Sequence, residues 1–200
     1  MVVNHMNSPK MKTMKPWILA VALCSFSPFL HAQSAEFSVN GGASKLSSRD
    51  IGSGYSLDDG FNIGFRLTLN PYRFFGHEGG YNYNRTHLLL SGTDLGGMAI
   101  HQGFYNFLVY GTPEGFRVRP FVAGGAHFSN FVPPGSSATQ GGGNTKFGVN
   151  YGGGVKFKVS SMFQLRLDFH QYLTGKPFDI PGASGKLRQN VVSAGFGFVL

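Results

Sequence analysis

The sequence predicts an all-β protein: an eight-stranded antiparallel up-and-down transmembrane β-barrel with a cleaved N-terminal signal peptide. Three observations lead to this fold class. The 200-residue chain has only 13% charged residues but contains 30 glycines and 20 phenylalanines. Apolar and polar residues alternate with a period of two along most of the chain. Short and long connections alternate between these segments, as they do in membrane barrels.

Composition excludes several other classes. The 42% hydrophobic share is too high for a disordered polar chain, and the glycines follow no collagen-like period of three. No run of eighteen apolar residues follows position 30, so we expect no membrane-spanning helix there. The basic residues are scattered without forming the concentrated stripe of a nucleic-acid site. We therefore expect no nucleic-acid partner.

The N-terminal segment 1–32 has the order of a secretory signal peptide. A small basic segment precedes the apolar stretch 17–26, and Ala32 supplies a small residue for cleavage. Residues 1–10 look like an overlong start. The predicted organisation is therefore a signal peptide at 1–32 followed by one barrel domain at 33–200.

The period of two marks eight strands of about ten residues, the length that a tilted strand needs to cross a bilayer. In 147–159, for example, Phe157 lies on the apolar face and Lys156 on the polar one. In 98–110 both faces mix polar and apolar residues, so we expect a bulge that shifts the register there. The predicted strands are 35–44, 61–70, 75–86, 98–110, 116–129, 147–159, 163–173 and the C-terminal segment that ends at Leu200.

The connections differ in length in a regular way. Tight turns are expected at 70–73, 111–115 and 160–162. Longer links, rich in Gly, Ser, Asp, Asn and Pro, are expected to be solvated loops; they are 46–58, 87–97, 130–145 and 174–188. Short turns at one end and long loops at the other are typical of an up-and-down membrane barrel.

Alternation alone does not say which face of the sheet points outward. The apolar face contacts lipid in a membrane barrel, whereas it fills the interior of a soluble, lipocalin-like barrel. The large aromatic apolar face and the polar face rich in Gly and Asn favour the membrane barrel. Buried cations then need acidic partners, because an unpaired buried charge is costly. The predicted lumen charge network comprises Glu36, Arg66, Glu78, Lys156, Lys158, Arg166 and Asp168.

Other residues have simpler interpretations. Tyr72, Phe74 and Phe75 lie beside the first tight turn, so we expect them in an aromatic girdle at the membrane interface. The histidines show no ligand spacing of the kind that zinc sites use. We therefore expect neither a metal nor a cofactor.

Four segments resemble the bacterial outer-membrane β-barrel domains of the OmpA/OmpX/OmpW type: Arg119–Ala126, Asn150–Phe157, Leu165–Phe169 and Ser193–Phe198. The resemblance implies location in the outer membrane of a Gram-negative-type bacterium after export through the periplasm. It implies folding by the barrel-assembly machinery with periplasmic chaperones, and contact with outer-membrane lipid and lipopolysaccharide. The implied function is a non-enzymatic structural or surface-contact role through the external loops.

Two alternative functions remain open at this point. His127-Phe128-Ser129-Asn130 resembles a stretch of the PagL-type lipid A deacylases, which implies His127 as base and Ser129 as nucleophile. The acid of that family would follow about a dozen residues later, but 131–145 contains no Asp or Glu. The other alternative is a narrow pore, although an eight-stranded interior is just wide enough for side chains to fill.

Overall fold

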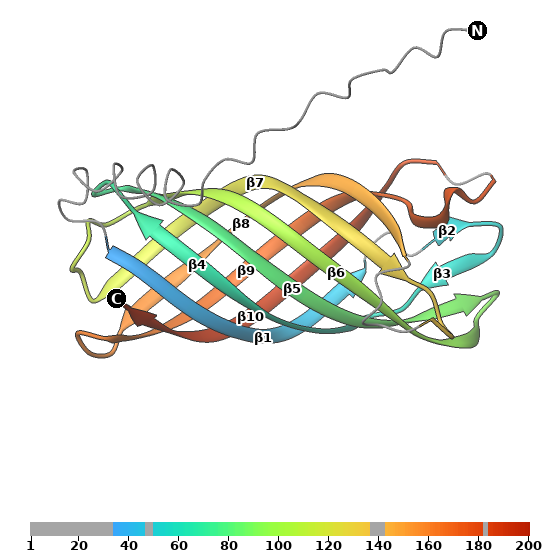
Figure 1. Cartoon of the computed structure of the whole chain (residues 1–200), viewed down its shortest axis with the longest axis horizontal. Coiled ribbons are helices and arrows are strands. Elements are labelled where there is room, and N and C mark those ends of the chain that lie inside the picture. Colours follow the sequence, from blue (N-terminus) through green and yellow to red (C-terminus); the bar gives the residue numbers. More distant parts are fainter. Residues whose placement is uncertain (1–33, 47–49, 137–142, 182–183) are drawn as a thin grey trace, which may run out of the picture. The chain divides into compact units, whose positions relative to one another are not determined.

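The computed structural model describes residues 34–46, 50–136, 143–181 and 184–200, so the predicted signal peptide at 1–32 lies outside the described residues. The described chain forms a β-barrel of long, inclined strands (Figure 1). Its elements are β1 (Ser34–Leu46), β2 (Asp50–Gly52), β3 (Tyr55–Leu57), β4 (Gly60–Asn70), β5 (Phe75–Leu90), β6 (Thr93–Tyr110), β7 (Val118–Val132), β8 (Asn144–Lys158), β9 (Phe163–Gly175), the 3-10 turn η2 (Pro177–Asp179) and β10 (Lys186–Val199).

The sheet closes on itself through eight long strands. β1 pairs with β4 on one side and with β10 on the other, and β5 pairs with β6 to complete the ring. All of these pairings are antiparallel. A closed sheet satisfies its backbone amides internally, which a strand protein needs in lipid. The predicted eight-stranded antiparallel barrel is confirmed, whereas the cleaved signal peptide stays a prediction.

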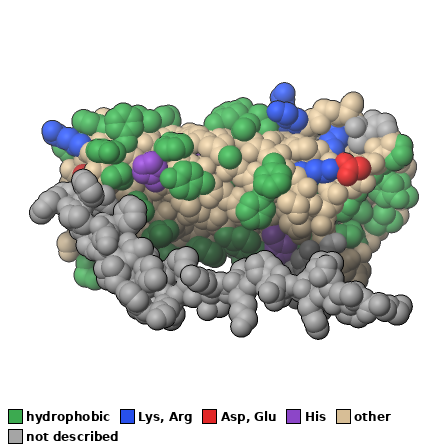
Figure 2. All heavy atoms as spheres, turned by 45° about the horizontal axis from the view of Figure 1, so that its top comes forward, with side chains coloured by type: hydrophobic (Ala, Val, Ile, Leu, Met, Phe, Trp, Pro, Cys, Tyr) green, Lys and Arg blue, Asp and Glu red, His purple; other side chains and the backbone are tan. Residues whose placement is uncertain are grey.

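The apolar face of the barrel points outward. Phe65 is 49% exposed, whereas its neighbour in sequence, Arg66, is 1% exposed. The same contrast holds on β9, where Leu167 is exposed and Arg166 is buried. Hydrophobic side chains cover much of the outer wall in Figure 2. A soluble, lipocalin-like barrel requires the opposite arrangement, so that alternative is wrong.

Two kinds of connection define the ends of the barrel. The turn end carries the short links at 71–74, 111–117 and 159–162, and the loop end carries all other links between the long strands. Within the described ranges, no helix has the length and apolar character to cross a bilayer.

The strand that follows the β5–β6 turn keeps a regular register, so the bulge expected in 98–110 is wrong. Pairing with β5 and β7 continues without a shift from Ala99 to Val109, and burial alternates from Ile100 to Tyr110. The irregularity lies earlier, where the β5–β6 pairing shifts between Leu88 and Leu89. In the sequence, both faces of 98–110 mix polar and apolar residues because the inner face of β6 carries apolar side chains, including Ile100.

The solvated loop predicted at 87–97 is instead the tip of a projecting hairpin. β5 and β6 continue pairing as far as Leu90 and Thr93, and only Ser91 and Gly92 connect them. Both connecting residues have positive φ, 50° and 86°. A two-residue turn of this kind matches the twist of paired strands. The pairing of β5 with β6 therefore extends beyond the strands that the alternation of apolar and polar residues predicts.

Glycines on the inner wall make room for polar side chains. A Cβ at Gly125 of β7 would lie 1.9 Å from the carbonyl oxygen of Tyr105 and 2.6 Å from Oδ1 of Asn106. A Cβ at Gly152 of β8 would lie 2.1 Å from the carbonyl oxygen of Phe169. Neighbouring strands and lumen side chains therefore approach these positions too closely for any larger residue.

Candidate functional site

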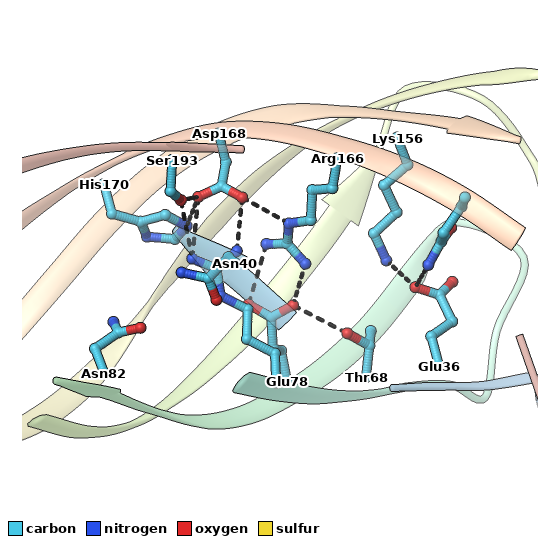
Figure 3. Close-up of polar contacts among 12 residues, drawn as sticks. Glu36, Asn40, Thr68, Glu78, Asn82, Lys156, Arg166, Asp168, His170 and Ser193 are labelled. Carbon is cyan, nitrogen blue, oxygen red and sulfur yellow. Dashed lines mark hydrogen bonds and ion pairs between the residues drawn. The ribbon is translucent and has the colours of Figure 1, made fainter. Parts of the chain in front are cut away.

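The middle of the lumen holds a network of two guanidinium groups and two carboxylates. Arg66 of β4 donates two hydrogen bonds to Asp168 of β9, at 2.6 and 3.1 Å. Arg166, also on β9, donates from Nε to Asp168 at 2.8 Å and forms an ion pair with Glu78 of β5. Figure 3 shows Arg166 lying between the two carboxylates. The two positive and two negative charges balance here. Such pairing is needed because an unpaired buried charge is costly.

Further polar side chains contact both acids. The hydroxyl of Thr68 donates to Glu78 at 2.9 Å, and the hydroxyl of Ser193 donates to Asp168 at 2.9 Å. Nε2 of His170 lies 3.8 Å from Asp168. Each carboxylate thus has several donors on different strands, which ties opposite walls of the barrel together.

A second ion pair lies nearer the turn end. Lys156 of β8 pairs with Glu36 of β1, and both side chains are buried. Gln164 and Asn70 donate further hydrogen bonds to Glu36, at 2.7 and 2.8 Å. Lys156 also donates to the hydroxyl of Tyr110 at 3.0 Å. This pair is separate from the central network and spans the lumen between other strands (Figure 3).

The structure assembles every predicted member of the charge network except Lys158. That side chain is exposed and lines the mouth of the lumen at the turn end, so its assignment to the buried network is wrong. Lys158 is the last residue of β8, where the wall no longer encloses its side chain. Sequence reasoning missed Arg119, which is buried with its guanidinium 3.4 Å from the ring centroid of Tyr110. Its position on the polar face of β7 was the available signal.

A ladder of amide side chains crosses the inner wall nearer the loop end. Asn40 donates to Asn62 at 3.2 Å, and Asn62 donates to Asn84 at 2.9 Å. Asn84 donates to Gln102 at 2.8 Å, which donates to Ser129 at 3.1 Å. The ladder links β1, β4, β5, β6 and β7. Sequence reasoning placed the Asn residues on the polar face without predicting that they would bond in a row.

An apolar cap closes the lumen at the loop end. Ile51 of β2 and Leu57 of β3 are fully buried in it, because β3 pairs with the end of β5 and brings the hairpin over the opening. The predicted solvated loop at 46–58 is therefore wrong for this part of the link, since its two aliphatic side chains can leave water by folding inward. The cap consists of Leu46, Ile51, Leu57, Leu88, Met98, Ile100, Phe131 and Leu187.

The Leu57→Ala substitution tests the cap. We expect it to destabilise the β2–β3 hairpin by about 2–4 kcal/mol, because it leaves a cavity among packed apolar side chains. Hydrogen exchange of the amides in β2 and β3 should accelerate while the long strands stay protected. The matched control Leu95→Ala, at an exposed position, should change stability by less than about 0.5 kcal/mol. Unchanged exchange in Leu57→Ala would contradict the packing.

The link after β9 is attached to the barrel by one apolar and one charged contact. Phe178 of η2 packs against the cap even though its φ is 66°, a conformation that bulky residues adopt only when their surroundings enforce it. Lys146 of β8 forms an ion pair with Asp179. The hydrogen bond from Lys146, together with its charge, holds the pKa of the Asp179 carboxyl below its ordinary value of 3.8.

This ion pair predicts a local pH dependence. Because the pKa of Asp179 is lowered in the folded protein, the contact should be fully present above the ordinary Asp value and lost as the pH falls through the folded value. An NMR titration of the carboxyl should give a pKa below 3.8, and Lys146→Gln should raise it. The same pKa in both proteins would show that the contact does not form in solution.

The two candidate catalytic residues do not form a pair. Nε2 of His127 lies 2.7 Å from the hydroxyl of Thr174, and Ser129 accepts a hydrogen bond from Gln102 instead. Both His127 and Ser129 are buried in the lumen. A serine esterase needs the base within hydrogen-bond reach of the nucleophile, and the geometry gives the deacylase alternative no support.

The predicted girdle residues lie together at the turn end. Tyr72, Phe74 and Phe75 are all exposed, and the guanidinium of Arg73 lies 5.7 Å from the ring centroid of Phe74. Exposed Met162, in another link of this end, adds to the same apolar rim. The interfacial role of these residues remains a prediction.

Chemically, the described part of the lumen is a filled interior. No group of three or more potential metal ligands occurs among the described residues. The central cations and acids neutralise each other, and the cap covers the loop end. Such an arrangement uses the lumen charges for contacts between strands.

One known protein family matches this chain. Its description is "Outer membrane protein beta-barrel domain", and its model matches residues 17–199. The chain belongs to this family. The protein is therefore located in the bacterial outer membrane, and the short turns of such barrels face the periplasm while the long loops face outward. No match was found among curated proteins.

Solved structures of outer-membrane barrels share the fold. Neisserial surface protein A superposes with a TM-score of 0.61 at 15% identity, covering 85% of this chain and 100% of that one. The N-terminal barrel of Pseudomonas aeruginosa OprF gives 0.54 at 14% identity, covering 84% and 97%. Ail, the attachment invasion locus protein of Yersinia pestis, gives 0.50 at 14% identity, covering 86% and 100%. At these identities the likeness concerns the fold alone.

Proposed function

We propose that this protein is a non-enzymatic outer-membrane barrel that contacts molecules outside the cell through its loop end. The observation that carries the proposal is that side chains occupy the lumen. In the described residues, the central charges pair with each other and an apolar cluster caps the loop end. Because the interior is occupied in this way, the loops are the part of the barrel that meets other molecules.

The names of two structural neighbours support this class of role. One is Neisserial surface protein A, and another is Ail, the attachment invasion locus protein of Yersinia pestis. Those names describe those proteins, and the shared fold makes surface contact the role to test first here. A purely structural role in the envelope is the competing outcome.

Lipopolysaccharide is the membrane partner that we propose. Lys45 of β1 and Arg188 of β10 are exposed on the outer wall near the loop end, on strands that pair directly. The phosphates of lipopolysaccharide are suitable acceptors for lysine and arginine side chains. These two residues support the proposal because both positive charges lie near the loop end, which faces outward in such barrels.

Changing the tip of the β5–β6 hairpin tests the contact role. Thr93, Asp94 and Leu95 are exposed at the tip, so replacing them with Ser alters its surface and leaves Leu88 of the cap and the residues that pair with β3 unchanged. Cells that display the variant should bind mammalian cells or matrix proteins less than cells with the unchanged protein. A variant with Gly and Ser at 112–116, in a periplasmic turn, is the control.

The outcomes separate the two roles. The amount of folded protein in the outer membrane should be equal in all strains, as judged by its faster migration on a gel before boiling. Equal binding by both variants would contradict the contact role. Increased leakage of the envelope when the whole protein is deleted, without any loss of binding, would favour the structural role instead.

The filled lumen also predicts the result of a conductance measurement. The purified protein in planar bilayers should show no discrete current steps, because an eight-stranded interior is filled by side chains and the cap covers the loop end. Reproducible steps that disappear when the protein is omitted would support the narrow-pore alternative.

A further inference from the structure

A small pocket opens at the turn end, where the lumen reaches the periplasmic surface. Its volume is about 50 Å³, more than the roughly 15 Å³ that one water molecule needs. Three cations line it, namely Arg119, Lys156 and Lys158, together with the acids Glu36 and Glu114. The charge network described above uses Lys156 and Glu36, so the other three are not engaged in it.

Arg119 is a buried cation with unused hydrogen-bonding capacity. It is only 6% exposed, its Nη2 donates to the carbonyl oxygen of Arg73 at 3.2 Å, and its guanidinium stacks on Tyr110. Its Nε has no hydrogen-bond partner among the described residues. Arg119 lines the pocket, so its positive charge attracts an anion that enters there.

Lys158 adds an exposed cation to the same pocket. Its side chain forms no ion pair among the described residues, in contrast to the buried Lys156 on the same strand. A strongly hydrated ammonium at the mouth and a buried guanidinium behind it suit an anion that enters from the periplasm. Phosphate oxygens are preferred partners of both groups.

The pocket also has an apolar side. Phe116 lines it and is exposed, at the same end of the barrel as the girdle residues Tyr72, Phe74 and Phe75. A ligand that combines a phosphate with hydrocarbon chains can therefore place the phosphate beside Arg119 while its chains follow the aromatic rim. Phospholipids in the leaflet that faces the periplasm have this composition.

We propose that this pocket binds the phosphate of an anionic phospholipid from the periplasmic leaflet of the outer membrane. Arg119 and Lys158 hold the phosphate, and Phe116 contacts the adjoining hydrocarbon. Glu114 weakens the attraction because its carboxylate lies on the pocket wall. This site is independent of any contact made by the loops at the other end.

The test is lipid binding by the folded, full barrel, measured by native mass spectrometry. The probes are phosphatidylglycerol and phosphatidylcholine with identical chains, and inorganic phosphate alone. We expect the unchanged protein to bind phosphatidylglycerol more tightly than phosphatidylcholine. Lys158→Gln should weaken phosphatidylglycerol binding about fivefold, the contribution of one basic residue near a membrane surface. Glu114→Gln should strengthen it.

Lys186→Gln is the matched control, because it removes one exposed positive charge at the opposite end of the barrel. It should leave phosphatidylglycerol binding unchanged. Equal affinity for the two lipids, or an equal loss in Lys158→Gln and Lys186→Gln, would overturn the proposal. Displacement of the lipid by inorganic phosphate at the same concentration would also overturn it, since the site would then recognise a free anion. All variants should retain the gel mobility of the folded barrel.

Discussion

Replacing Asp168 with Asn should lower the free energy of unfolding by about 3–5 kcal/mol, the usual effect of removing one partner from a buried ion pair. Asp168 accepts hydrogen bonds from Arg66, Arg166 and Ser193. Without its charge, Arg66 keeps a buried guanidinium that has lost its acidic partner. Urea unfolding in lipid vesicles, followed by the folded and unfolded bands on a gel, measures the change.

Two further variants make this result specific. Asp94→Asn removes a carboxylate that is half exposed and contacts His87, so it should change stability far less than Asp168→Asn does. The double variant Arg66→Met/Asp168→Leu removes one charge of each sign, and it should be less destabilised than Asp168→Asn because no uncompensated charge is left. A double variant that is less stable than the single variant would contradict the charge-balance explanation.

Replacing Phe65 with Arg should lower the free energy of unfolding in lipid by about 2–4 kcal/mol, the cost of a basic residue facing the middle of a bilayer. Phe65 occupies the centre of the outward-facing row of β4 and stacks on Phe37 and Tyr81, with ring centroids 6.5 and 5.8 Å away. The same urea titration measures the change.

The controls separate charge from packing and from depth. Phe65→Leu removes the ring without adding charge, so it should retain most of the stability. Leu95→Arg places the same charge at an exposed position near the tip of the β5–β6 hairpin, where we expect a cost of about 0–1 kcal/mol, as near the membrane interface. Equal effects of Phe65→Arg and Leu95→Arg would mean that both positions face water, which is incompatible with a lipid-facing wall.

The deviations from the expected strands have specific causes. Alternation located all eight long strands, but it could not detect that Ser91 and Gly92 would form a tight turn and extend β5 and β6. It also suggested a bulge in 98–110, because it assumed that the inner face is polar throughout. Apolar Ile100 and Leu108 face the interior there, which alternation cannot distinguish from a shifted register.

The apolar cap was invisible in the sequence for a related reason. Ile51 and Leu57 stand among polar residues with no period of their own, so the segment has the composition of a solvated loop. Their burial depends on pairing between β3 and the end of β5, a contact between segments that lie far apart in the sequence. Local composition contains no information about such a pairing.

Period-two alternation and the uneven connections predicted a closed barrel with two different faces, because successive side chains on a strand must point to opposite faces. The large aromatic apolar face and the polar face rich in Gly and Asn indicated that lipid lies outside. They also indicated which charges would be inside. They could not say that Arg66 would meet Asp168, 102 residues away, or that Lys158 would stay outside the network. Those outcomes depend on the tilt and stagger of the strands in the closed sheet. Tilt and stagger decide which side chains from different strands lie at the same depth in the barrel.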